Sequence, residues 1–561
     1  MTGDYFDLGT HTRRVTTASA TAQVWFDRGL VWAYAFNHEE AARCFTRALD
    51  ADPDCAMAAW GLAYALGPNY NKPWEFFDET ELAATVADTY AAVRRARARA
   101  GSVTPVEQAL IEALAARYPR NAPEGDGSAW NKDYAEAMRA VHARFPDDLD
   151  VATLCADALM NLTPWALWDQ RTGEPAAGSC TVEAKAILDR ALESAAGRAH
   201  PGILHLYIHL MEMSPTPETA LPVADRLRGL VPDAGHLEHM PTHLDVLCGD
   251  YRSVVRSNSA AIVADEKFAR RTGDLNFYTL YRAHDYHFKI YGAMFLGQSS
   301  VALETVAQLE NSISEELLRV TSPPMADWLE SFVSMRVHVL IRFGHWAQII
   351  DLPLPADRDL YCVTTAMLHY AKGIAYSATN RLHEAIREQE LFEAAYARVP
   401  ESRTLFNNTC RDILAIAAAM LEGELQYRNA DYDKAFESLR HSIHLDDSLP
   451  YDEPWGWMQP TRHAYAALLL EQGHIAEAEA VYRADLGLDD TLPRASQHPN
   501  NVWSLHGYHE CLTRLGKSEP ARIIAQQLKL ALAQADIPIE ASCFCRLSTA
   551  HTGTPGEPCC H

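Results

Sequence analysis

Apolar residues recur along this chain at intervals of three and four positions, which is the spacing of one face of an α-helix. The pattern holds from Trp25 onward, whereas the residues around Thr16 and Ser19 are rich in Thr and Ser and show no strand alternation. The apolar runs are short, and none approaches the roughly 18 residues that a membrane span needs. We therefore expect a folded, soluble, all-α protein that does not enter a membrane.

The helical segments pair into units of similar length. One unit near the N-terminus carries small, aromatic and proline residues in a fixed order: Trp25, Gly29, Trp32, Ala41, Phe45, Ala48 and Pro53. This order resembles the tetratricopeptide repeat, a pair of antiparallel helices of about 34 residues. The twelve-residue step from Gly29 to Ala41 recurs downstream, for example from Gly373 to Ala385. The resemblance implies an α-α superhelical solenoid of tetratricopeptide-type helix pairs.

Three regions follow from this frame. We expect an N-terminal leader at residues 1–20, a solenoid over residues 21–535, and a Cys/His-rich tail at residues 536–561. The repeats are degenerate near residues 68–130 and 305–365. Proline-containing interruptions at residues 67–74, 161–178 and 485–502 are predicted to be loops. In a solenoid, such insertions often gather over one face and can cover a groove.

Histidines recur at equivalent positions of consecutive repeats. If repeats begin at Pro201 and Gly235, positions 5 and 9 are histidine in both; a third repeat, from Ala283, has histidines at positions 2 and 5. These six residues are His205, His209, His239, His243, His284 and His287. The resemblance implies that positions 2, 5 and 9 of the first helix face the concave groove. We therefore predict that six imidazoles converge within residues 201–300.

Such a constellation suits a metal centre. Histidines four residues apart share a helix face and can chelate one ion, and six imidazoles suit two ions with three ligands each. Neutral imidazole selects copper, zinc, iron or nickel over magnesium or calcium. A lone buried histidine is more often structural, and internal duplication can repeat a residue without function. The different spacing of His284 and His287 argues against duplication alone.

A proline complicates the central pair. Pro241 lies between His239 and His243, and a helix that begins there would leave His239 at its cap. The two rings could still converge on a metal, although not by simple helical spacing. In that case His236 could take the place of His239.

Two acidic residues are candidates for catalysis. Asp157 falls at position 9 of the repeat preceding His205, and Glu212 follows His209 by three residues. Each could act as a ligand, as a general base, or as the carboxylate that orients a ligand imidazole. Solvated charge is the alternative interpretation of each residue taken alone.

Two hypotheses of function follow. The first is a metal-dependent oxidoreductase whose copper or iron centre activates dioxygen beside a small organic substrate. Zinc-assisted hydrolysis, with Asp157 or Glu212 as base, is its variant. The alternative is a non-catalytic tetratricopeptide scaffold that binds peptides or proteins in its groove. Histidine at the groove positions, where Lys, Arg and Asn are expected in clamps for carboxylates, favours metal.

The net charge and the cysteines narrow the choice of binding partners and of cellular location. The net charge of −25 opposes binding to nucleic acid and to anionic membranes. The N-terminus shows no basic region followed by an apolar stretch, so we expect a cytoplasmic protein with reduced thiols. The tail carries a cluster that suits either a soft metal or disulfide exchange: Cys543, Cys545, His551, Cys559, Cys560 and His561.

Overall fold

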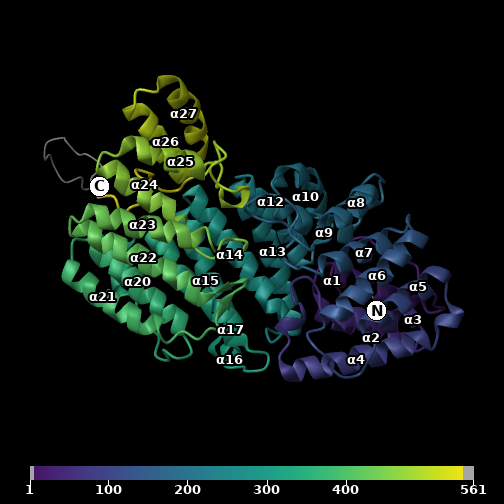
Figure 1. Cartoon of the computed structure of the whole chain (residues 1–561). Helices are drawn as coiled ribbons and strands as arrows, with labels where there is room; N and C mark the ends of the chain where they lie inside the picture. The colour runs from purple at the N-terminus through teal and green to yellow at the C-terminus, as the bar shows by residue number, and fades with distance from the viewer. Residues whose placement is uncertain (1–4, 548–561) are drawn as a thin grey trace. The chain divides into compact units, whose positions relative to one another are not determined.

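The computed structural model describes residues 5–547 and confirms the all-α architecture. The only sheet among these residues is a two-stranded hairpin of β1 (Thr404–Leu405) and β2 (Asn408–Thr409). Nowhere in this part of the chain is a helix both long and apolar enough to span a bilayer. Antiparallel helix pairs such as α20 (Cys362–Ala378) with α21 (Leu382–Tyr396) form the basic unit of packing (Figure 1).

The chain divides into two compact units. The first comprises residues up to Cys248 together with Arg256–Asp285 and Pro493–Ala495. Its complete α-helices are α1 (Ala20–Tyr34), α2 (His38–Ala51), α3 (Ala56–Leu66), α4 (Glu79–Arg97), α5 (Pro105–Arg117), α6 (Ser128–Arg144), α7 (Leu149–Met160), α8 (Thr181–Leu192), α9 (Pro201–Glu212), α10 (Leu221–Leu227), α11 (Gly235–His239) and α12 (Pro241–Leu247).

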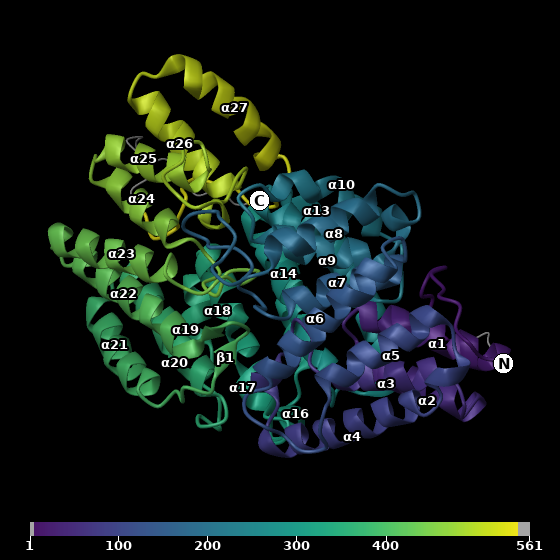
Figure 2. The same cartoon turned by 45° about the vertical axis from the view of Figure 1, so that its right-hand side comes forward.

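The second unit comprises Gly249–Val255, Tyr286–Leu492 and the residues from Ser496 onward. Besides α20 and α21 it contains α15 (Ser299–Ser312), α16 (Glu315–Leu318), α17 (Met325–Leu329), α18 (Met335–Arg342), α19 (Trp346–Asp351), α22 (Cys410–Arg428), α23 (Tyr432–Asp446), α24 (Thr461–Glu471), α25 (Ile475–Asp485), α26 (Val502–Arg514) and α27 (Ser518–Leu532). Helices α13 (Tyr251–Thr272) and α14 (Tyr278–Leu296) contribute residues to both units. Figure 2 shows α20, α21, α22 and α23 running side by side.

Small residues allow the helices of a repeat to approach closely. A Cβ atom on Gly29 would lie 2.8 Å from the Phe45 ring, and one on Gly61 would lie 2.4 Å from it. Phe45 of α2 is therefore packed against α1 and α3 through two glycines, and its side chain is fully buried. This contact explains why the sequence pattern requires glycine and an aromatic residue at these positions.

Many helix pairs share one turn geometry. A residue with positive φ lies two positions before the second helix of the pair at Phe36, Gly249, Gly297, Gly344, Asn380, Ala430, Gly473 and Gly516. Glycine is expected here because it alone adopts the left-handed region without a steric penalty from Cβ. Asn380 and Ala430 have small side chains. Phe36, with φ of 54°, is the bulky exception.

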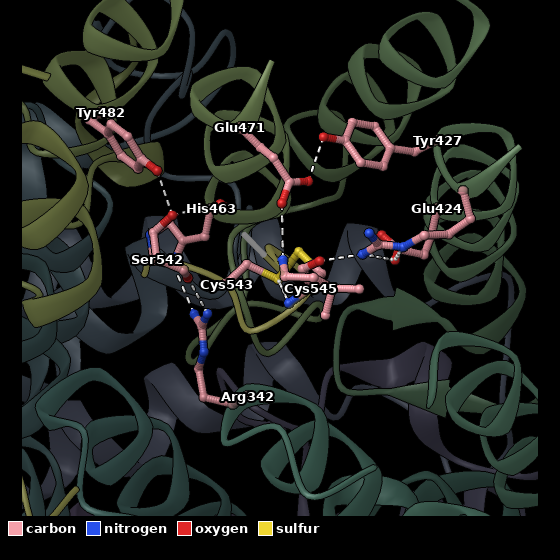
Figure 3. The surroundings of a disulfide bond; sticks show 11 residues. Arg342, Glu424, Tyr427, His463, Glu471, Tyr482, Ser542, Cys543 and Cys545 are labelled. Atoms are coloured by element: carbon pink, nitrogen blue, oxygen red, sulfur yellow. Dashed lines mark hydrogen bonds and ion pairs between the residues drawn. A yellow bond between two sulfur atoms is a disulfide. The ribbon is translucent and has the colours of Figure 1, made fainter. Parts of the chain in front are cut away.

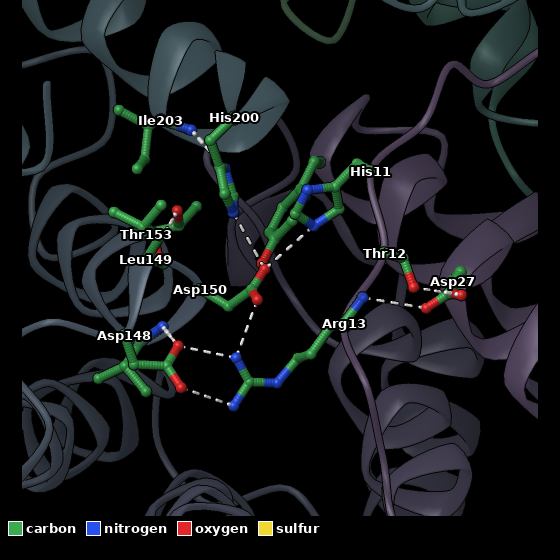
Figure 4. Close-up of polar contacts among 12 residues, drawn as sticks. His11, Thr12, Arg13, Asp27, Asp148, Leu149, Asp150, Thr153, His200 and Ile203 are labelled. Atoms are coloured by element: carbon green, nitrogen blue, oxygen red, sulfur yellow. Dashed lines mark hydrogen bonds and ion pairs between the residues drawn. The ribbon is translucent and has the colours of Figure 1, made fainter. Parts of the chain in front are cut away.

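The segment before α1 is anchored to α7 by a buried ion-pair network (Figure 4). Arg13 Nη1 donates to Asp148 Oδ1 at 2.7 Å and to Asp150 Oδ2 at 2.8 Å. The rings of His11 and His200 lie 3.2 and 3.1 Å from Asp150 Oδ1. Burial works to raise the pKa of Asp150, but the hydrogen bonds from both histidines bring it well below its usual range. The predicted leader is thus packed onto the first unit.

The three predicted interruptions contain loops. Asn69 and Lys72 exchange backbone hydrogen bonds in a tight turn after α3. Residues 161–180 connect α7 to α8 without a helix, and residues 486–501 connect α25 to α26 with only a short 3₁₀ turn at Arg494–Ser496.

Candidate metal centre

Helix α9 presents two buried histidines on one face. It begins at Pro201, whose missing N–H suits the first helical position, and His200 caps it by accepting a hydrogen bond from Ile203 N. The ring centroids of His205 and His209 are 4.8 Å apart, as expected for residues four apart on a helix. His236 of α11 completes a group whose ligand nitrogens all lie within 4.8 Å of one another. We call His205, His209 and His236 the first histidine set.

A second group follows directly in the chain. Helix α11 ends at His239 and α12 begins at Pro241, as the proline predicted, but Met240 keeps helical angles (φ −49°, ψ −39°). His239 and His243 therefore still face one another, with their Nε2 atoms 2.7 Å apart. His284 Nε2 of α14 lies 3.5 Å from His243 Nε2. His239, His243 and His284, whose ligand nitrogens also lie within 4.8 Å, form the second histidine set.

Hydrogen bonds at Nδ1 fix the orientation of the rings. His205 Nδ1 donates to the carbonyl oxygen of Tyr34 at 2.6 Å, and His239 Nδ1 lies 2.7 Å from Asn258 Oδ1. A ring that donates from Nδ1 carries its lone pair on Nε2, the atom a metal binds. Both rings therefore present a ligand nitrogen to their set.

Glu212 links the two sets. Its Oε1 lies 3.0 Å from His209 Nδ1, and its Oε2 lies 2.6 Å from His243 Nδ1. The carboxyl group is completely buried, so the two imidazoles hold it where water does not reach. One carboxylate thus orients one ligand ring in each set, which is the arrangement known to raise ligand basicity in metal sites.

The Nε2 atoms of the first set lack hydrogen-bond partners. Among the described residues, no donor or acceptor contacts Nε2 of His205 or His209, or either ring nitrogen of His236, and all these atoms are buried. A buried polar atom without a partner is destabilising by roughly 1–3 kcal/mol. Several such atoms gather in the first histidine set.

The electrostatic environment keeps the rings neutral. Burial, followed by the neighbouring imidazoles, holds the pKa values of four rings well below their usual range: those of His205, His209, His236 and His239. Neutral imidazole is the form that binds a metal, because a protonated ring has no lone pair to donate. These four rings are therefore in the metal-binding form at neutral pH.

Aromatic residues enclose the first set. The ring centroid of Phe36 lies 4.4 Å from that of His205, and Tyr70 and Trp165 lie 5.0 and 5.8 Å from His209. Tyr70 and Trp165 come from two of the predicted loops, and Trp165, like Phe36, has positive φ (58°). Bulky residues held in this strained conformation are characteristic of functional sites.

The structure separates one predicted ligand from the others. His287 belongs to the second unit, where its Nε2 lies 2.7 Å from Met458 Sδ and its ring packs on Phe332. Its predicted place among the six ligands is wrong, because three residues further along α14 the side chain faces a different neighbourhood. His236, which the sequence offered as a substitute for His239, instead joins the sets alongside it.

Asp157 does not belong to either histidine set. Its Oδ2 accepts a hydrogen bond from the Tyr64 hydroxyl at 2.9 Å, and its Oδ1 accepts one from Asn161 at the same distance. Burial raises the pKa of this carboxyl. Its contacts favour a structural role over the predicted one as a catalytic base.

Several residues of the site escaped sequence reasoning. Phe36 carries a detectable signal, since it occupies a turn position where equivalent turns have Gly, Asn or Ala. The hydrogen bond of Asn258 to His239 depends on the packing of α13, which no local pattern reveals. In the tail, Cys543 and Cys545 form a disulfide. The other predicted tail residues, His551, Cys559, Cys560 and His561, lie outside the described residues.

Comparisons with known proteins agree with the repeat architecture. Residues 22–55 match the family model of the tetratricopeptide repeat. The predicted resemblance is confirmed. No curated protein sequence matches the chain.

Solved structures resemble it distantly. The APC/C hetero-tetramer Cut9-Hcn1 is 14% identical with a TM-score of 0.30, covering 91% of this chain and 76% of that one. The human IFIT1 dimer with m7Gppp-AAAA is 10% identical with a TM-score of 0.32, covering 86% and 90%. Yeast Tom70 is 10% identical with a TM-score of 0.27, covering 91% and 92%. The family match concerns a repeat and not a catalytic activity.

Proposed function

We propose that the first unit is a repeat scaffold that binds a pair of transition-metal ions, one in each histidine set. The observation that carries this proposal is the grouping of the rings. Nδ1 of His205, His209, His239 and His243 is engaged, and each ring belongs to a group of three histidines whose ligand nitrogens lie within 4.8 Å of one another. Three imidazoles with an open position suit a reactive metal better than a structural one.

The donor atoms narrow the choice of ion. Both sets consist of imidazole nitrogen alone, and the nearest carboxylate, Glu212, is engaged at Nδ1 of two ligand rings. Imidazole donors without carboxylate suit copper, and next iron or zinc, whereas magnesium and calcium require oxygen ligands. We favour copper or iron, which when bound would supply redox chemistry with dioxygen.

The chain's own residues would have three roles in such an oxidoreductase. The six imidazoles bind the ions, Glu212 and Asn258 hold ring orientation, and the aromatic enclosure of Phe36, Tyr70 and Trp165 excludes water. The hydrolytic variant is less well supported, because it needs a free base. Asp157 and Glu212 are both occupied by other hydrogen bonds.

Metal content tests this proposal. Metal-free protein is loaded separately with copper, iron and zinc, desalted, and measured by elemental mass spectrometry. We expect two ions per chain, with a loss in both His205→Ala and His243→Ala. His338→Ala is the matched control, since His338 is a buried histidine of the second unit that packs on Trp457. Absence of bound metal under every condition would contradict the proposal. Oxygen consumption with added reductant then separates redox activity from simple binding.

Peptide binding by the second unit is the other candidate function, and one observation favours it (Figure 3). The segment that ends the described chain runs across this unit's helices, where Arg342 of α18 donates to the carbonyl oxygen of Ser542 and Arg428 of α22 donates to that of Cys545. Ser542 Oγ donates to the carbonyl oxygen of His463 at 2.9 Å. The surface thus binds this segment through the backbone carbonyl oxygens of Ser542 and Cys545 and through the hydroxyl group of Ser542.

A labelled peptide with the sequence of residues 540–547 tests this candidate. It is added to a chain shortened to residue 539, and binding is followed by fluorescence anisotropy. We expect saturable binding that weakens in Arg342→Ala and in Arg428→Ala, because each loses a donor to the peptide backbone. Equal binding by both variants would contradict it.

A further inference from the structure

A cavity of about 120 Å³ lies in the first unit beside the first histidine set. Its walls include the aromatic rings of Phe36, Phe77, Phe277 and Tyr278. An apolar cavity of roughly 150 Å³ is known to accommodate benzene, so this volume suits a single ring rather than a larger molecule. Aromatic walls favour an aromatic occupant, because stacked and edge-to-face contacts add to the burial of area.

The cavity also contains one cation. Lys72, which lines it, is 9% exposed, and its ammonium lies 4.3 Å from the Phe77 ring centroid and 4.9 Å from that of Phe277. One of its donors goes to Glu81. An ammonium has three N–H donors, so it can also donate to an oxygen on a molecule held between the rings.

A second polar group in the wall is uncharged at neutral pH. His38 lines the cavity, and its ring centroid lies 6.0 Å from that of Phe36. Burial lowers the pKa of His38 to about 4. The cavity therefore offers one ammonium, a neutral imidazole and two carboxyl groups, those of Glu39 and Glu81.

Phe36 is the wall between this cavity and the histidines. Its ring lines the cavity and stacks on His209 and His236, with centroids 5.5 and 5.7 Å apart. The strain of its positive φ, which glycine avoids at five of the equivalent turns, is tolerated here. The backbone conformation places the Phe36 ring between the cavity and the first histidine set.

We propose that this cavity binds a small molecule with one aromatic ring and an oxygen acceptor, either hydroxyl or carboxylate, and that Phe36 is the gate between this molecule and the first histidine set. The ring packs among Phe36, Phe77 and Phe277, and the oxygen accepts from Lys72. This inference rests on the proposed function for the role of the gate, but the binding itself needs no metal.

Calorimetric titration of the metal-free protein with benzoate and with phenol tests the binding. We expect saturable binding of at least one, weakened about tenfold or more in Lys72→Met, since a charge-assisted hydrogen bond is lost. Phe77→Ala should weaken binding independently of the charge, which keeps the test sound if one variant misfolds. Cyclohexanecarboxylate, which lacks the aromatic ring, should bind more weakly than benzoate. Absence of binding by both aromatic probes would overturn the proposal, even if the protein holds two metal ions.

Removal of bound metal by 2-(aminomethyl)pyridine, a chelator with one aromatic ring, tests the gate. Phe36→Gly keeps the positive φ and removes the ring, so extraction should be about tenfold faster than in wild type. Asn380→Gly is the matched control, because it relieves the backbone strain of an equivalent turn in the second unit. We expect no change in the extraction rate in this variant. Equal extraction rates in wild type and Phe36→Gly would overturn the gate. A protein that binds benzoate but no metal would support the cavity and contradict the metal centre.

Discussion

Both units bury histidines, but they surround them differently. In the first unit, His205 and His239 are held at Nδ1, and six histidines form two groups of three whose ligand nitrogens lie within 4.8 Å of one another. In the second, His463 is held at both nitrogens, with Nδ1 2.9 Å from Arg342 Nη1 and Nε2 3.0 Å from Asp485 Oδ2. Burial of histidine is thus no sign of metal binding by itself. What distinguishes the first unit is that its imidazoles converge on one another in groups of three.

Asp485 is the centre of the second unit's polar network, and its loss should have the largest effect. Its carboxylate is fully buried and pairs with His463 and His498. Asp485→Ala removes one partner of a buried network, so we expect the free energy of unfolding to fall by about 3–5 kcal/mol. Denaturant unfolding measures the change. The exposed Asp490 gives the control, Asp490→Ala, which should be close to neutral.

The metal content of the folded Asp485→Ala variant tests the contrast between the histidine environments of the two units. The network stabilises the second unit and supplies no metal ligand in our account, so the variant should still bind two ions. Loss of metal from folded Asp485→Ala would show that the two kinds of histidine environment are not distinct.

Glu212→Gln should weaken metal binding without removing a ligand. The neutral amide accepts less strongly and cannot orient two donating rings equally, so affinity should fall about 10–100-fold. Competition with a chromophoric chelator measures it. Glu218→Gln, at an exposed position six residues on, should leave affinity unchanged. If Glu212→Gln binds as tightly as wild type, the carboxylate does not orient the ligands.

Buried histidines that bind no metal should make the stability of the folded protein depend on pH. Burial lowers the pKa of His338 to about 3, against about 6.5 in an unfolded chain. Between these values the unfolded chain holds a proton that the folded chain lacks. This contribution to stability is therefore complete above about pH 6.5 and is lost as the pH falls.

His338→Gln removes this titration. From pH 6 to pH 5, the variant should lose about 1 kcal/mol less stability than wild type, as measured by denaturant unfolding at each pH. Metal loading should leave this difference unchanged, because His338 is not a ligand in our account. An identical pH slope in variant and wild type would contradict the low pKa.

Asn258→Ala should have the smallest effect. It removes one neutral hydrogen bond from His239 Nδ1, so affinity at the second set should fall by about 1 kcal/mol, or roughly fivefold. Stepwise copper titration resolves the weakened ion from the other. A uniform loss at both sets would show that Asn258 acts on overall stability and not on one ring.

The sequence predicted the fold because each repeat carries its own local pattern. Gly29, Ala41 and Phe45 pack within one helix pair, so their spacing alone reveals the contact. The histidines on α9 were predicted for the same reason, since helical spacing places His205 and His209 on one face.

Local sequence patterns do not predict contacts between segments that are distant in the sequence. The register of α14 decides that His284 faces the second set and His287 faces Met458. If the repeat frame is shifted by a few residues, the predicted environments of His284 and His287 are exchanged. The sequence offered His236 only as a substitute for His239, whereas the structure groups it with His205 and His209 of α9. Such packing is set by helices far apart in sequence.

The pair on α14 tests the central claim most directly. His284 and His287 lie three residues apart on one helix, and both are buried. Copper is titrated into metal-free wild type, His284→Ala and His287→Ala, and the stoichiometry and affinity of each ion are measured by chelator competition. Our account predicts that His284→Ala loses or greatly weakens one ion and that His287→Ala binds both as wild type does. Loss of copper from His287→Ala with retention in His284→Ala would contradict the two histidine sets.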